Sequence, residues 1–231
     1  MIALPPEAWE ALRLSLRVSV TAVAVAAPLA LVVAHLLARG RFPGRGLLDA
    51  AVHLPLVLPP VVTGYALLLL FAPSAPLGAA LASLGLPLAF RWTGAALAAG
   101  VMAFPLIVRP VRLAIESVDP RLEEAAATLG RGPWAVWRTV TLPLIAPGIL
   151  AGLTLGLAKA FGEFGATITF AASIPGETRT LPAAIYAFLQ VPGAEAPVRG
   201  LVLVALAVSV AALLVSDVLA RRLARRVAGR A

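Results

Sequence analysis

The chain lacks cysteine and has little charge. With no cysteine among its 231 residues, it can form no disulfide bond and cannot use a thiolate as a nucleophile or metal ligand. Only 13% of the residues are charged, whereas a typical soluble domain has about 25%. Hydrophobic residues make up 61% of the chain. This composition indicates a protein that lies in a membrane rather than in water.

Lysine and histidine are also scarce, and their scarcity argues against two classes of active site. The only lysine, Lys159, is followed by Ala-Phe, so the chain has no G-x-x-x-x-G-K-[ST] loop for nucleotide phosphates. His35 and His53 lie in apolar runs without an acidic cluster, which argues against a metal site or a protease-like active site. We therefore expect no catalytic residue, metal or cofactor on this chain, and any ATP-driven step would need a separate subunit.

Long uncharged runs predict the fold class. A helix that crosses a bilayer needs about 20 mainly apolar residues. The runs predict an all-helical integral membrane protein that forms one domain, 1–231, with spans at roughly 15–38, 48–71, 92–114, 143–162 and 199–220. Leu77 to Phe90 is also apolar but is short and contains Gly78, Gly85 and Pro87, so a re-entrant or interfacial segment is expected there rather than a sixth span.

The placement of arginine predicts the orientation, because cytoplasmic loops are enriched in Lys and Arg. An N-terminus outside and a C-terminus in the cytoplasm would put most basic residues on the cytoplasmic side: Arg39, Arg41, Arg45, Arg109, Arg112, Arg121, Arg131, Arg138, Arg221, Arg222, Arg225, Arg226 and Arg230. The net charge of +8 is then explained by cytoplasmic anchoring, and nucleic acid is not an expected partner.

A short amphipathic helix is predicted over 119–130, between two apolar runs. Asp119-Pro120 is a good helix start, because Asp caps the first free N–H groups and Pro fits the first helical position. Gly130 is a good stop, because it can adopt the left-handed conformation after the last turn. Glu123 and Glu124 lie off a single apolar stripe, whose residues recur at i, i+3, i+4 and i+7: Leu122, Ala125, Ala126 and Leu129.

This helix is only about 15 Å long, so it cannot cross a membrane, and a helix so short is marginal alone in water. After it, Pro133 can open a second helix that carries Trp134, Trp137 and Val140 along the membrane surface before Leu142-Pro143 leads into the next span. Two interpretations remain open from the residues alone. The segment is either an interfacial loop helix anchored by Trp and Arg, or a docking helix that inserts into a cytoplasmic partner.

The spacing Glu124-Ala125-Ala126, three residues, Gly130, nine residues, Val140, one residue, Leu142-Pro143 resembles the EAA loop of ABC importer permeases. The family usually has isoleucine or a similar aliphatic residue where this chain has Val140. The resemblance implies a type I (MetI-like) permease fold and a coupling helix that sits in a cleft of an ATP-hydrolysing subunit. It assigns that role to Asp119, Leu122, Glu123, Glu124, Ala125, Ala126, Leu129, Gly130, Val140, Leu142 and Pro143.

The chain is most similar, within that family, to molybdate permeases. Three stretches carry this resemblance: RGRFPGRGLLDA (39–50), LPLVLPPVVTGY (54–65) and FGEFGATITFAASIPGETRTLPAAIYAFLQ (161–190). It implies import of molybdate or tungstate across a bacterial or archaeal cytoplasmic membrane. The implied partners are a second copy of the chain, two ATP-binding cassette subunits that carry ATP and Mg²⁺, a soluble molybdate-binding protein and membrane lipid.

Two alternatives to that function remain. Sulfate permeases share much of 161–190, so a sulfate or thiosulfate importer is the nearer alternative. An ion-coupled secondary transporter is the more distant one, because such proteins show inverted repeats and ionisable residues at the membrane midplane, and this chain shows neither.

The pore is predicted from a proline-rich stretch and one charged pair. HLPLVLPPVVTGY, 53–65, is either an irregularly packed helix or a bent helix that lines the pore. Lys159 and Glu163 are spaced i, i+4 and can pair, or Glu163 can border an external gate. The residues assigned to the pore or gate are Pro59, Pro60, Thr63, Gly64, Lys159, Glu163, Phe164, Gly165 and Thr167.

Overall fold

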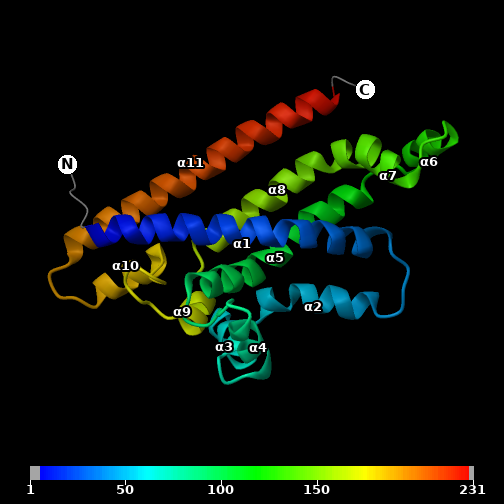
Figure 1. The fold of residues 1–231 in the computed structure, drawn as a ribbon. Helices are drawn as coiled ribbons and strands as arrows, with labels where there is room; N and C mark the ends of the chain where they lie inside the picture. The colour runs from blue at the N-terminus through cyan, green and yellow to red at the C-terminus, as the bar shows by residue number, and fades with distance from the viewer. Residues whose placement is uncertain (1–5, 229–231) are drawn as a thin grey trace.

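The computed structural model describes residues 6–228, and this part of the chain is helical without β-strands (Figure 1). The elements in order are α1 (Pro6–Arg39), α2 (Arg45–Val57), α3 (Pro60–Phe71), α4 (Pro76–Ser83), α5 (Trp92–Glu116), α6 (Pro120–Thr128), α7 (Pro133–Val136), a π-helical turn (Trp137–Thr141), α8 (Leu142–Phe161), α9 (Gly165–Ala171), α10 (Leu181–Leu189) and α11 (Glu195–Ala228).

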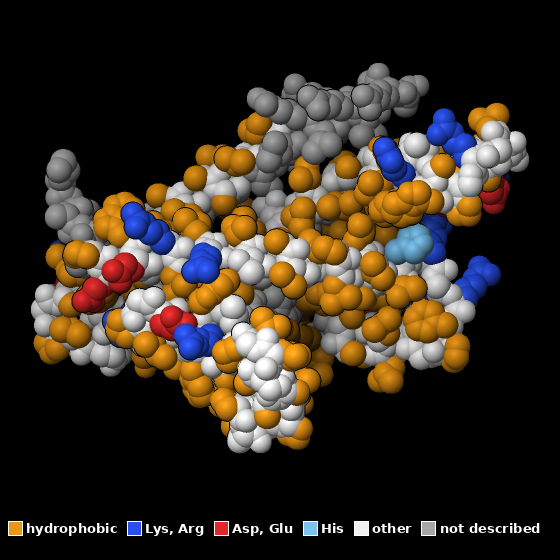
Figure 2. Space-filling view, in the orientation of Figure 1, with side chains coloured by type: hydrophobic (Ala, Val, Ile, Leu, Met, Phe, Trp, Pro, Cys, Tyr) orange, Lys and Arg blue, Asp and Glu red, His pale blue; other side chains and the backbone are white. Residues whose placement is uncertain are grey.

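Within the described residues, four helices are long and apolar enough to cross a membrane, or five if the bent pair α2 and α3 forms one span. The N-terminal end of α1 and the C-terminal end of α11 lie at opposite ends of the bundle, and α6 lies at the end where α1 finishes (Figure 1). Charged side chains gather at these two ends on the visible face, and a hydrophobic band lies between them (Figure 2). The predicted all-helical membrane fold is confirmed.

The segment 48–71, for which the sequence predicts one span, is divided by a sharp bend. α2 and α3 meet at an angle of 116°. Leu58 is extended, with φ −72° and ψ 143°, because the ring of a following proline disfavours helical backbone. Pro59 and Pro60 also supply no backbone N–H, so α3 begins afresh at Pro60. The bend considered for 53–65 is therefore present, and it is a break between two helices rather than a kink.

The apolar stretch 77–90 does not form a sixth span. Its helix, α4, has eight residues. At about 1.5 Å per residue it is roughly 12 Å long, well short of the hydrocarbon core of a bilayer.

Small residues pack the centre of the bundle, where α5 lies between α1 and α8. The alanines that fill the buried core are Ala22, Ala26, Ala30 and Ala34 of α1 and Ala95, Ala99 and Ala103 of α5. On the other side of α5, three glycines spaced by four let α8 approach it closely: Gly148, Gly152 and Gly156. A Cβ on Gly152 would lie 2.8 Å from the Ile107 carbonyl oxygen, so the two backbones approach as small-xxx-small pairs do in membranes.

The fourth predicted span begins earlier than expected. The sequence suggests a surface helix after Pro133 and a separate span from 143, but Pro133–Phe161 forms one continuous helical stretch of 29 residues. Pro143 has no N–H for the carbonyl of Thr139, and its ring would crowd that carbonyl in a regular helix. The π turn just before it absorbs this misfit, and the Leu142 N–H donates to the Trp137 carbonyl.

Candidate functional site

The short helix α6 forms where the sequence predicts it. The Asp119 side chain caps its start by accepting a hydrogen bond from the Arg121 N–H at 2.9 Å. Gly130 ends it with φ +81°. The Gly130 N–H donates to Ala127 at 3.0 Å and the Arg131 N–H to Ala126 at 3.4 Å, which is the bond pattern of a Schellman motif. Both ends of the helix are therefore set by local chemistry.

The apolar stripe of α6 faces away from the rest of the chain. No residue of α6 is buried, and Leu122 is 49% and Leu129 is 82% exposed. Trp134 follows them with 70% exposure and stacks on Trp137 at 5.1 Å between ring centroids. Large apolar side chains that stay uncovered together mark a surface that contacts another molecule.

α6 is instead attached to its own chain through a carboxylate. Glu123 Oε1 accepts a hydrogen bond from the Thr141 hydroxyl at 2.6 Å, and its Oε2 lies 3.5 Å from Arg39 Nη2. Arg39 Nη2 also donates to the Val118 carbonyl at 3.1 Å. The neighbouring Glu124 is exposed. The two adjacent glutamates thus point to different surroundings, one toward the chain and one toward solvent.

The last three residues of the predicted coupling motif lie outside α6. Val140 belongs to the π turn, and Leu142 and Pro143 begin α8. Val140 and Leu142 are half-buried, while Pro143 is exposed. The motif therefore spans two structural pieces, a free helix and the base of the next long one.

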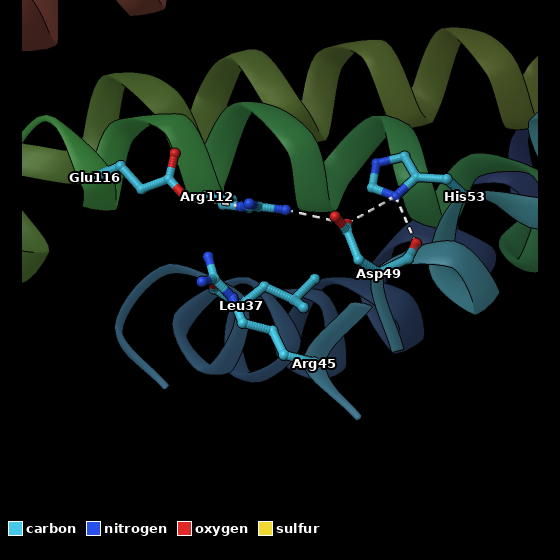
Figure 3. Close-up of polar contacts among 6 residues, drawn as sticks. All are labelled: Leu37, Arg45, Asp49, His53, Arg112 and Glu116. Atoms are coloured by element: carbon cyan, nitrogen blue, oxygen red, sulfur yellow. Dashed lines mark hydrogen bonds and ion pairs between the residues drawn. The ribbon is translucent and has the colours of Figure 1, made fainter. Parts of the chain in front are cut away.

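A second polar cluster ties α2 to α5 (Figure 3). It includes Glu116, the last residue of α5 before the turn into α6. Arg112 Nη1 donates to Asp49 Oδ1 at 3.0 Å, and Arg112 Nε donates to Glu116 Oε1 at 2.8 Å. His53 Nδ1 lies 3.2 Å from Asp49 Oδ1. Arg45 Nε, at the start of α2, donates to the Leu37 carbonyl of α1 at 3.0 Å. The sequence does not predict this cluster; its available signals are two i, i+4 spacings, Asp49 with His53 and Arg112 with Glu116.

The predicted pore residues of α3 and α9 are brought together by close backbone packing. A Cβ on Gly64 would lie 2.5 Å from the Ala166 carbonyl oxygen. A Cβ on Gly165 would lie 2.8 Å from Pro60 Cβ. Thr63 is buried beside Gly64, and its hydroxyl has no partner among the described residues. Pro59 is exposed at the bend itself.

Glu163 joins α8 to α9. Its carboxylate is 1% exposed and lies 2.7 Å from Lys159 Nζ, so the ion pair expected from the i, i+4 spacing is present. The other carboxylate oxygen accepts a hydrogen bond from the Ala166 N–H at 2.9 Å, at the start of α9. Thr167 donates to the Phe164 carbonyl at 2.9 Å, and the Phe164 ring packs on Tyr186 with 5.2 Å between centroids. Through its contacts with Lys159 and Ala166, Glu163 connects the end of α8 to the start of α9.

Comparison with known proteins identifies the family. Residues 11–229 match the family described as binding-protein-dependent transport system inner membrane component. The chain belongs to this family. It is thus a multi-pass permease subunit of the cytoplasmic membrane, part of an ABC importer that works with a binding protein.

Individual relatives agree with this assignment. The molybdenum transport system permease protein ModB of Escherichia coli (strain K12) is 51% identical over 231 residues, which is all of both chains. The sulfate transport system permease protein CysT of the same strain is 38% identical over 202 residues, which is 86% of this chain and 72% of CysT. A crystal structure of a bacterial ABC transporter that imports alginate has a chain with the same fold, with a TM-score of 0.74, 19% identity and coverage of 94% of this chain and 80% of that one.

Proposed function

We propose that two copies of this permease subunit form the translocation pore of an importer for molybdate or tungstate, and that α6 of each copy docks on a separate ATPase subunit. A soluble binding protein delivers the oxyanion from outside. ATP and Mg²⁺ are bound by the ATPase subunits, and this chain supplies no catalytic group.

The uncovered stripe of α6 is the observation that carries the proposal. A nine-residue helix has little stability of its own, yet α6 is capped at both ends and leaves its apolar side chains exposed. An amphipathic helix that offers i, i+3 and i+7 anchors fits a hydrophobic groove on a partner. An interfacial helix anchored by Trp and Arg is the alternative, and retention of an ATPase subunit separates the two.

The pore cycle follows from two such docked helices. Closure of the ATPase dimer around ATP draws the two copies of α6 together, and the helices that follow α6 rearrange so that the pore opens outward. Hydrolysis separates the ATPase subunits and returns the inward state. In this cycle the N-terminus lies outside, and the α3–α9 contact lies on the translocation path.

Whole-length similarity supports molybdate over sulfate as the cargo. The alignment with the molybdenum permease covers the whole of this chain at 51% identity, whereas the alignment with the sulfate permease covers 86% of it at 38% identity. Both anions are tetrahedral and doubly charged, so the binding protein makes the finer choice among them. Tungstate has the same shape and charge as molybdate and remains a cargo of the proposed importer.

Retention of the ATPase subunit by affinity-tagged permease tests the docking. Wild type is expected to retain it, and Leu129→Asp is expected to lose it, because a charge would enter an apolar groove without a partner. Leu189→Asp, which changes an exposed leucine on α10 at the other end of the bundle, is the matched control and should retain the ATPase subunit. Equal retention by Leu129→Asp and wild type would contradict docking through the stripe.

A further inference from the structure

Three segments that are distant in sequence meet at one carboxylate. Glu123 of α6 uses one oxygen for Thr141, the last residue of the π turn, and the other for Arg39, the last residue of α1. Thr141 is 2% exposed, and the side chains of Arg39 and Glu123 are 29% and 28% exposed. We call Arg39, Glu123 and Thr141 the α6 clamp.

The clamp is the main side-chain attachment of α6 to the described part of its own chain. α6 has no buried residue, and its apolar stripe is uncovered, so packing gives it little fixed direction. Arg39 holds both the Glu123 carboxylate and the Val118 carbonyl, which precedes the capping residue of α6. A planar guanidinium that binds a helix at its start and again one turn later restrains its tilt as well as its position.

The π turn places the third member of the clamp. A π turn inserts one extra residue into a helix, so side chains on either side of it differ in direction by about 100° from a regular helix. Thr141 is the final residue of that turn, and its hydroxyl reaches Glu123 at 2.6 Å. The misfit caused by Pro143 therefore also gives α6 its contact with the base of α8.

We infer that Arg39, Glu123 and Thr141 are positioning residues that pass a displacement of α6 to α1 and α8. The inference rests on the proposed docking of α6 to an ATPase subunit. Because α1 and α8 both pack along α5, a pull on α6 moves the three long helices together rather than bending the short linkers beside α6. The two adjacent glutamates then have different roles. Glu124 contacts the ATPase subunit, and Glu123 transmits the displacement of α6 to α1 and α8.

Molybdate uptake per ATP hydrolysed separates a residue that transmits the displacement from one that only contacts the ATPase subunit. The complete complex of permease, ATPase subunits and binding protein is reconstituted in lipid vesicles, and uptake of molybdate is measured beside ATP hydrolysis. Glu123→Gln keeps the shape and the acceptor for Thr141 but removes the charge that holds Arg39. It is expected to retain the ATPase subunit and to lower molybdate uptake per ATP about fivefold or more. Glu124→Gln, the matched change one residue on, is expected to weaken retention of the ATPase subunit.

A second pair of variants tests the α8 arm of the clamp. Thr141→Val removes the hydroxyl with little change in shape and should lower uptake per ATP, whereas Thr141→Ser keeps the hydroxyl and should retain the wild-type uptake per ATP.

Wild-type uptake per ATP in Glu123→Gln, with the ATPase subunit bound, would overturn the clamp and leave the proposed function standing. Loss of the ATPase subunit from Glu123→Gln, to the extent seen in Glu124→Gln, would also overturn it, because Glu123 would then be a partner contact. Failure of the wild-type chain to retain any ATPase subunit would remove the proposed function and the clamp together.

Discussion

Gly64 lies so close to Ala166 that no other residue fits at position 64 without a shift of the backbone. The Cβ of any other residue there would lie 2.5 Å from the Ala166 carbonyl oxygen. This contact joins α3, which follows the bend after α2, to α9, which follows the corner at Glu163. Two interrupted segments are thus held against each other by glycine at the place where the pore is proposed.

The first prediction concerns this contact. Gly64→Ala should lower the stability of the purified permease by roughly 1–3 kcal/mol, as overpacking does, and should reduce transport because α3 is pushed away from α9. Gly46→Ala is the control, because a Cβ there meets nothing within 4 Å, and it should behave as wild type. Thermal unfolding in detergent and uptake in vesicles measure the two effects. Equal unfolding temperatures for Gly64→Ala and Gly46→Ala would show that the contact is not tight.

The second prediction concerns the tie between α2 and α5. Arg112→Gln removes the ion pair with Asp49 and should lower stability by about 0.5–1 kcal/mol, a modest amount because both side chains are partly in solvent. Glu116→Gln leaves the Asp49 contact intact and should cost less. A double-mutant cycle of Asp49→Asn with Arg112→Gln, followed by thermal unfolding, measures the interaction; strictly additive losses would mean that the pair contributes nothing.

The third prediction concerns Glu163. Its carboxylate is almost fully buried between Lys159 and the start of α9, so Glu163→Gln should lower stability by about 1–3 kcal/mol and alter transport or the basal ATP hydrolysis rate. Lys159→Gln provides the comparison, because it removes the charge partner and leaves the hydrogen bond to Ala166 in place. If Glu163→Gln loses stability but transports at the wild-type rate, Glu163 is a structural residue of the α8–α9 corner and not part of the gate.

The fourth prediction concerns the end of α6. Gly130 has φ +81°, and Gly130→Val should strain the Schellman motif by about 1–2 kcal/mol and uncouple ATP hydrolysis from transport while the chain still inserts in the membrane. Gly132→Ala is the control, because Gly132 has φ −65° and open space around its Cα. Uptake per ATP is measured for both. Unchanged coupling in Gly130→Val would show that the left-handed turn is dispensable.

Features set by local chemistry could be predicted from the sequence. The bounds of α6 follow from Asp119 and Gly130, whose effects reach only one helical turn. The membrane class follows from runs of apolar residues, and the Pro59-Pro60 pair indicates a bend although not its angle of 116°. The exposure of the apolar stripe could not be read from periodicity, since the same pattern serves a core or a docking face.

Features that depend on distant contacts could not be predicted. Arg39 and Glu123 are brought together by the packing of α1 beside α5, and no local spacing relates them. The close approach of α8 to α5 depends on which helix faces Gly148, Gly152 and Gly156, and a single sequence does not specify that partner. The π turn arises because Pro143 lies inside a longer helix. A span that begins at 143 would need no such turn, so the sequence did not predict it.

The proposed function is tested most directly by ATP hydrolysis of the purified complex in lipid, with its binding protein loaded in turn with molybdate, tungstate or sulfate. We expect an ATPase subunit to be recovered with this chain, and molybdate or tungstate to stimulate hydrolysis while sulfate does not. Equal stimulation by sulfate would contradict the assigned cargo. Failure to recover any ATPase subunit would contradict the docking of α6, on which the proposed mechanism depends.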